Sequence, residues 1–343
     1  MQDSGSLAGL IAAADFNLHW FDLGRRVQSV ASADATAFEA GRAPWPHPYL
    51  RQAWTGLLLE PRAGGEPVVW FLRLPLDEQG KLQLAVRDAF VHLLIDKLGH
   101  GDGAELGERL HSALQESGIA YTPAPERQAT FHARVAQLLQ RPPSEHFDAV
   151  LEYCRAPQSH RWDQLAVQGI ADLAVRWKEH QSLLCDTLEQ LAPPVFIGLC
   201  QCLESEAIDA ELAGRIIDRA DAAPGDSAIT AAAVRGLSLA PAAELRRRFL
   251  TRLLQGEAAS NSEVIAAIGS RCSSDLEHGD IAAAWLAAMA EHQSQDTFNL
   301  LLSDLMFLPA VRAALLDALR DPARPEILAR AFGHFLHGPN PPH

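Results

Sequence analysis

Cysteine is scarce in this chain of 343 residues, which contains only five, an odd number without paired spacing. They are Cys154, Cys185, Cys200, Cys202 and Cys272. An odd set without paired spacing argues against a disulfide framework, because each bridge needs two partners. Such thiols are typical of small apolar side chains buried in proteins of a reducing compartment. The sequence therefore predicts a cytoplasmic protein without disulfides.

Long apolar runs are absent as well. No segment approaches the ~20 apolar residues that a membrane-spanning helix needs. The apolar stretch 7–14 is short, follows Asp3 instead of a basic segment and runs into Asp15, which is unlike a signal peptide. We expect no membrane association, and cytoplasmic residence is the prediction that remains.

Basic residues are outnumbered, since 29 Lys and Arg stand against 43 Asp and Glu and the formal net charge is -14. A surface of this average charge repels phosphate backbones, so no nucleic-acid partner is expected. The densest basic group is formed by Arg246, Arg247, Arg248 and Arg252. Because these arginines alternate with apolar positions of a predicted helix, we expect all of them on its solvated outer face.

Motifs of the common enzymes and cofactor sites are also missing. The sequence has no G-x-x-x-x-G-K-[ST] phosphate loop, G-x-S-x-G elbow, H-E-x-x-H pair or EF-hand loop. Cys200 and Cys202 offer a metal only two ligands, as do His334 and His337, whereas structural zinc takes four. The sequence thus favours a non-enzymatic protein without a metal or another cofactor.

The first hundred residues carry the pattern of a small β-sheet. Segments 16–23, 54–60 and 67–74 are rich in Trp, Phe, Leu and Val and are bounded by Gly and Pro, which predicts strands. Segment 27–31 predicts a weaker strand. The pair Gly64–Gly65 can adopt positive φ, so the strands on either side of it should form an antiparallel hairpin.

A helix is predicted after this hairpin, because apolar residues recur at helical spacing from Leu82 to Leu98. Asp77 and Glu78 precede it, at the place where the helix dipole favours acidic side chains. With this helix laid on the sheet, residues 1–122 form a predicted N-terminal α+β domain. The proline-containing segment 121–125 ends that domain.

Short amphipathic helices predominate from about residue 126 onward, and no strand is predicted there. The clearest apolar stripe runs from Trp162 to Trp177 with i, i+3, i+4, i+7 spacing, and prolines fall between the stripes. Such short helices must bury their stripes on one another, as in HEAT or armadillo repeats, although the irregular spacing also allows a compact irregular helical domain. The prediction is a mostly helical α+β chain with a helical domain at 126–337 and a tail at 338–343.

The most unusual local feature is the segment Pro44–Tyr49, in which three alternating prolines stiffen the backbone. Its other residues, Trp45, His47 and Tyr49, would form a recognition surface if they project into solvent. The alternative, which the burial of aromatic residues favours, is that the segment crosses the sheet and its aromatic side chains cover the core.

Residues 48–54 (PYLRQAW) and 67–80 (PVVWFLRLPLDEQG) resemble a proteobacterial family of proteins of unknown function, and the resemblance extends over most of the chain. It implies a bacterial cytoplasmic protein and no particular activity. Within the second segment it singles out a motif, which adds to the candidate binding residues Trp70, Arg73, Asp77, Glu78 and Gln79.

Two functional hypotheses follow. In the first, the chain is a non-enzymatic interaction protein or scaffold, whose helical stack offers a surface to a protein partner while the N-terminal domain caps it. In the second, a small molecule binds, for catalysis or sensing, at the junction of the two domains, where clefts often bind ligands. That site would use the N-terminal aromatic residues together with Asp77 and Glu78.

Overall fold

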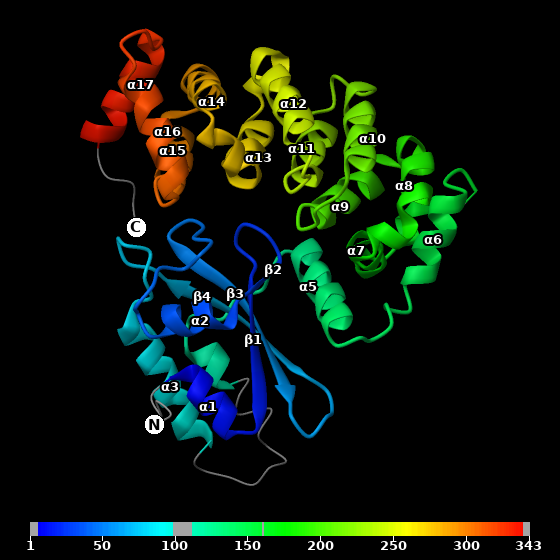
Figure 1. Ribbon diagram of the computed structural model, residues 1–343, viewed down its shortest axis with the longest axis vertical. Helices are drawn as coiled ribbons and strands as arrows, with labels where there is room; N and C mark the ends of the chain where they lie inside the picture. The colour runs from blue at the N-terminus through cyan, green and yellow to red at the C-terminus, as the bar shows by residue number, and fades with distance from the viewer. Residues whose placement is uncertain (1–5, 99–111, 160, 339–343) are drawn as a thin grey trace. The chain divides into compact units, whose positions relative to one another are not determined.

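The computed structural model describes residues 6–98, 112–159 and 161–338 (Figure 1). The chain divides into two compact units, Met1–Ala124 and Pro125–His343, which are treated separately below. Apart from Gly338, the predicted tail at 338–343 lies outside the described residues.

The first unit contains the predicted sheet, which is four-stranded, antiparallel and ordered β2-β1-β3-β4. Its strands are β1 (Phe16–Asp22), β2 (Gln28–Val30), β3 (Gln52–Pro61) and β4 (Val68–Pro75). The hairpin of β3 and β4 is confirmed, and Gly64 and Gly65 in its connection have φ of 83° and 126°. Only glycine adopts such angles without a steric penalty, so these two residues set the position of the hairpin turn.

Helices α1 (Leu7–Ala13), α2 (Ser32–Glu39) and α3 (Leu84–Leu98) contact the sheet. Trp20, Leu57 and Trp70 lie side by side on three neighbouring strands, and all three are buried. They form the centre of an apolar core to which α2 contributes Phe38 and α3 contributes Phe90. The expected helix after the hairpin is confirmed as α3.

The second unit is helical throughout the residues that the structure describes, and the prediction of no strand there is confirmed for them. Its α-helices are α5 (Pro125–Leu138), α6 (Phe147–Arg155), α7 (Val167–Val175), α8 (Gln181–Thr187), α9 (Pro193–Leu203), α10 (Ala210–Asp221), α11 (Ser227–Gly236), α12 (Ala243–Gln255), α13 (Ser262–Arg271), α14 (Gly279–His292), α15 (Gln295–Leu305), α16 (Pro309–Arg320) and α17 (Glu326–His337). The chain is therefore α+β and mostly α.

These helices pack in two rows. The odd-numbered helices contact one another in chain order from α5 to α17, and the even-numbered helices do so from α6 to α16. In Figure 1, α7, α9, α11 and α13 follow the inner side of an arc, and α8, α10 and α12 follow its outer side. One apolar core extends through the unit from Ala129 to Ala331. Each helix thus buries its apolar stripe against its neighbours in the stack.

Prolines and polar caps set the helix boundaries. Pro193 and Pro309 occupy the first positions of α9 and α16, where the missing N–H costs no hydrogen bond. The side chains of Asp209, Asp226 and Asn261 accept hydrogen bonds from the first free N–H groups of α10, α11 and α13. The prediction that prolines separate the helices is confirmed at these sites.

The prediction of one continuous helical stripe from Trp162 to Trp177 is wrong. Only Val167–Val175 forms an α-helix, between the short 3-10 turns η2 (Trp162–Gln164) and η3 (Trp177–His180). The backbone is extended between η2 and α7, and the Trp162 side chain is 45% exposed. Because 3-10 turns share the i, i+3 spacing, the apolar pattern alone does not distinguish them from a longer α-helix.

Candidate functional site

Two of the candidate binding residues are core side chains. Trp45 is 1% exposed, packs on Phe38 at a ring-centroid distance of 4.8 Å and donates its indole N–H to Asp22 Oδ1 at 3.1 Å. Trp70 is buried with its ring edge-on to Phe90. The Pro44–Tyr49 segment therefore covers the core with Trp45, in line with the alternative interpretation.

The residues around Trp45 share a buried carboxylate. Asp22 accepts hydrogen bonds from Trp45 and from the N–H groups of Gly24 and Arg25. Burial raises the pKa of Asp22 despite these bonds and the nearby His47. Burial also lowers the pKa of His47, against the opposing effect of Asp22. This arrangement holds the Pro44–Tyr49 segment on the sheet. The hydrogen bonds to Asp22 explain why a carboxylate is buried there without a ligand.

Tyr49 and Arg73 meet at Trp54. The Trp54 indole N–H donates to the Tyr49 carbonyl at 3.0 Å, and the Arg73 guanidinium lies 5.5 Å from the centre of the indole ring. Tyr49 begins a tight turn in which Leu50 and Arg51 both have positive φ, a backbone conformation that costs energy in residues other than glycine.

Asp77 and Glu78 do not lie at the start of a helix, and the interpretation that placed these two acidic residues there is wrong. The Asp77 Oδ1 accepts hydrogen bonds from the N–H groups of Gln79 at 2.8 Å and Lys81 at 2.9 Å, which closes a turn that ends before α3 begins at Leu84. Glu78 and Gln79 are exposed at the tip of this turn. An aspartate that bonds the backbone two and four residues ahead stabilises a turn as well as it would a helix end, so the sequence did not separate the two.

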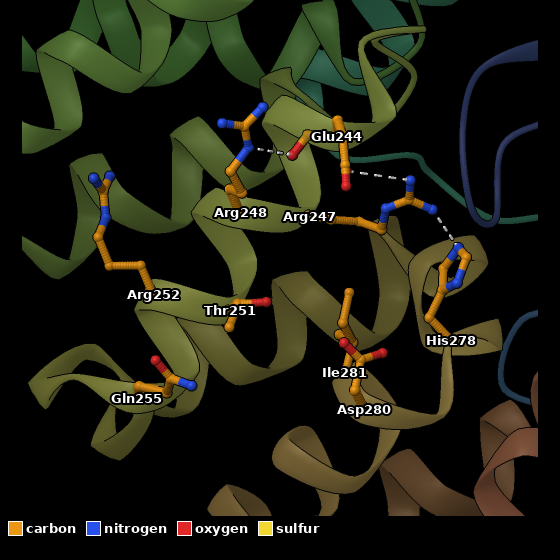
Figure 2. Close-up of a pocket in the computed structure, with 9 residues that line it drawn as sticks. All are labelled: Glu244, Arg247, Arg248, Thr251, Arg252, Gln255, His278, Asp280 and Ile281. Atoms are coloured by element: carbon orange, nitrogen blue, oxygen red, sulfur yellow. Dashed lines mark hydrogen bonds and ion pairs between the residues drawn. The ribbon is translucent and has the colours of Figure 1, made fainter.

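A groove in the second unit brings charged side chains together that the sequence analysis did not combine. It lies between α12 and α14 and has a volume of about 510 Å³ (Figure 2). The residues that line it come from α12 and from the start of α14 with the residue before it: Glu244, Arg247, Arg248, Thr251, Arg252, Gln255, His278, Asp280 and Ile281. Three of them are arginines in a chain of net charge -14.

The hydrogen bonds and ion pairs of the arginines in this groove are exposed, and the Arg252 guanidinium also lies 5.4 Å from the centre of the Phe249 ring. Arg252 pairs with Asp221 at 2.6 Å, and Arg247 lies 3.7 Å from Glu244 and donates to His278 Nε2. Within the part of the chain that the structure describes, Arg248 forms no ion pair and donates only to the Glu244 carbonyl (Figure 2). Exposed pairs contribute about 0–1 kcal/mol each, so carboxylates of a ligand can replace them at little cost.

The fourth arginine of the cluster corrects the expectation that all four are solvated. Arg246 is 9% exposed, and its Nε and Nη2 donate to the two carboxylate oxygens of the buried Asp275 at 2.6 and 2.9 Å. Arg246 shares the core-facing side of α12 with Phe249 and Leu250, three and four residues further along. The bidentate pair joins α12 to the segment before α14 and so fixes the two walls of the groove.

The described residues give no support for a reactive cysteine or for a metal-binding site. All five cysteines are buried and form no disulfide among the described residues, and burial raises the pKa of Cys154 and Cys202 to about 12, so the reactive thiolate is suppressed. No group of three or more His, Cys, Asp or Glu side chains within residues 6–98, 112–159 and 161–338 is arranged to hold a metal ion. In the same ranges, no helix combines the length and apolar character needed to cross a bilayer.

Comparison with known proteins gives one match. A family model described as "Protein of unknown function (DUF3549)" matches residues 4–336. No curated protein and no solved structure matches the chain.

Proposed function

Since the chain belongs to the DUF3549 family of proteins of unknown function, we propose its role from its own surface: it is a non-enzymatic interaction protein that binds an acidic segment of a partner protein in the α12–α14 groove. The observation that carries this proposal is the concentration of Arg247, Arg248 and Arg252 in one groove of an acidic chain. Planar guanidinium groups suit carboxylates because they donate in parallel pairs.

The packing of the second unit supports the scaffold role. Two rows of short helices, each in contact with its neighbours in chain order, are the arrangement of HEAT and armadillo repeats, which present extended surfaces to other proteins. We include this repeat architecture and a cytoplasmic location in the proposal. Five buried cysteines, none in a disulfide among the described residues, accord with a reducing compartment.

The composition of the groove favours a protein segment over a nucleic acid. Glu244 and Asp280 line it beside the arginines, and they would repel a continuous phosphate backbone. Thr251 and Gln255 add neutral hydrogen-bonding groups, whereas Ile281 is 2% exposed and belongs to the core. A peptide with a few carboxylates and some neutral polar side chains complements this mixture.

The second hypothesis, a small-molecule site built from the N-terminal aromatic residues and Asp77, has weaker support. Trp45 and Trp70 are enclosed in the core, and the Asp77 carboxylate is engaged with the backbone of its own turn. These side chains already have partners within the fold.

Selection from a displayed library of random dodecapeptides tests the proposal. The full chain should enrich peptides rich in Asp and Glu, and the variant Arg248→Glu with Arg252→Glu should lose that enrichment. The matched control, Arg155→Glu with Arg330→Glu, makes the same change of charge at exposed arginines of α6 and α17 and should retain it. Equal enrichment by both variants would refute the proposal, as would selective binding of single-stranded oligodeoxythymidine in place of acidic peptides.

A further inference from the structure

A second groove lies next to the first, on the other side of α14. It has a volume of about 640 Å³ and separates α14 from α16. Its lining consists of small and acidic residues: Glu277, Gly279, Ala283, Ala310, Ala313, Ala314, Asp317, Ala318, Asp321 and Pro322. The two grooves share α14 as a common wall, since Asp280 and Ile281 line the first and Gly279 and Ala283 line the second.

Alanine is the most frequent residue in the lining of the second groove. Five alanines from α14 and α16 make up half of the ten lining residues, and their methyl groups leave room in the groove for larger apolar side chains of a ligand. A helix that settled there would satisfy its own backbone hydrogen bonds, whereas an extended peptide would hold unpaired N–H and C=O groups against alanine methyls. The groove therefore favours a helical occupant.

The charges of the two grooves are opposite. Arginines line the α12 side of the first groove, and Glu277, Asp317 and Asp321 lie at the second. These three acidic residues are exposed, and among the described residues none of them forms an ion pair. A ligand that spans both grooves must therefore be acidic toward α12 and basic toward α16.

We infer that the bound segment is one amphipathic helix of the partner protein that lies across α14, with carboxylates at Arg248 and Arg252, a bulky apolar side chain above the alanines and a basic residue at Glu277 and Asp317. This inference rests on the proposed function and specifies its partner. Neighbouring helices pack about 8–10 Å apart, so the span from α12 to α16 is roughly 16–20 Å. At a rise of 1.5 Å per residue, that span needs about 11–13 residues. Acidic, apolar and basic residues at i, i+7 and i+11 would share one face of such a helix.

Synthetic alanine-based helical peptides test the inference by fluorescence anisotropy with the full chain. The probe carries Glu, Leu and Lys at i, i+7 and i+11, and its relatives replace Leu by Ala or Lys by Glu. The protein variants are Ala283→Leu with Ala313→Leu, which fills the second groove at exposed positions, and Glu277→Lys with Asp317→Lys, which reverses its charge. Matched controls are Ala210→Leu on α10 and Glu152→Lys with Glu189→Lys, all exposed. Circular dichroism and thermal unfolding establish that each variant is folded.

The Glu-Leu-Lys probe should bind best to the unmodified chain, and filling or recharging the second groove should weaken it about tenfold, which corresponds to about 1.4 kcal/mol. The charge-reversed variant should instead prefer the peptide in which Glu replaces Lys. Binding that depends on Arg248 and Arg252 but not on the second groove would overturn this inference and leave the proposed function standing. Binding that ignores Arg248 and Arg252 would overturn the proposed function itself.

Discussion

At the residue scale, the ionisation of Glu206 links the stability of the helical unit to pH. Its carboxylate lies 2.8 Å from Arg134, yet burial raises its pKa to about 7. The folded chain then holds a proton that the unfolded chain, with a glutamate pKa of about 4.3, has released. The free energy of unfolding must therefore fall as the pH rises from about 4.5 to about 7.

Glu206→Gln removes this titration while it keeps a neutral side chain of similar shape. We expect the loss of stability between about pH 5 and pH 8, on the order of 1–3 kcal/mol in the unmodified chain, to shrink in the variant. Urea unfolding at the two pH values measures this change in the free energy of unfolding. The control is Glu152→Gln at an exposed position of α6. An unchanged pH dependence in Glu206→Gln would contradict the assignment.

Substitution by alanine of two glycines in helices of the second unit should change the stability of the chain in opposite directions. A Cβ at Gly269 in α13 would lie 2.6 Å from the Trp285 ring, whereas a Cβ at Gly214 in α10 meets no atom within 4 Å. We expect Gly269→Ala to destabilise the chain by about 1–3 kcal/mol through overpacking. Gly214→Ala should stabilise it by about 0.5–1 kcal/mol through helix propensity. Thermal unfolding of both variants checks this, and equal effects would show that the close contact with Trp285 is unimportant.

Single residues also show what the sequence could and could not predict. The burial of Trp45 followed from the tendency of aromatic side chains to enter cores, so its alternative interpretation was available in advance. Arg246 was assigned to solvent because it belongs to a run of arginines that alternates with apolar positions of a predicted helix. Its partner, Asp275, is 29 residues away, and only the packing of the helices brings it near.

At the scale of elements, the pair of Arg246 and Asp275 holds α12 to the segment that precedes α14. Arg246→Met should cost about 3 kcal/mol of unfolding free energy, because it leaves a buried carboxylate without its bidentate partner. Arg248→Met on the exposed side of the same helix should change stability by at most about 0.5 kcal/mol. Urea unfolding of the two variants compares them directly, and a similar cost for both would contradict the buried role of Arg246.

Helices and strands with a strong periodic pattern were predictable, and those governed by local turns were not. The β3–β4 hairpin follows from a glycine pair between two apolar runs, and α3 follows from its long apolar repeat. Helix α2 has few apolar residues to form a pattern, with Ala35 and Phe38 as its buried apolar side chains. The turn that begins at Asp77 depends on hydrogen bonds to the backbone, which hydropathy does not record.

At the scale of the second unit as a whole, each helix contacts mainly its neighbours in the stack. A destabilising substitution should therefore affect only the helices near it. Leu328 is fully packed in α17, and Leu328→Ala should cost about 2–4 kcal/mol. In a stack that is stabilised by nearest-neighbour interfaces, amide exchange should accelerate in α14 to α17 and stay unchanged in α7 and α9. Leu199→Ala in α9 should give the complementary pattern. Hydrogen-exchange mass spectrometry measures both, and uniform acceleration would contradict this picture.

The candidate site became visible only at this larger scale. The four arginines stand out in the sequence, but the groove also needs His278, Asp280 and Ile281, which follow after another complete helix. Which helices become neighbours in each row is decided by packing, and no spacing in the sequence records it. The cluster of arginines in the sequence therefore indicated α12 as one wall of the groove. The other wall, at the start of α14, could be identified only from the fold.

The buried cysteines allow transient opening of the helical unit to be measured by labelling of their thiols. Cys154, Cys185, Cys200 and Cys202 lie in α6, α8 and α9, and Cys272 follows α13, so the five thiols sample several levels of the stack. Cys185 is 8% exposed, whereas a small alkylating reagent can reach the other four sulfurs only when the surrounding helices separate. The order in which the five become labelled would therefore rank the local breathing of the stack, level by level, in a protein that carries no added probe.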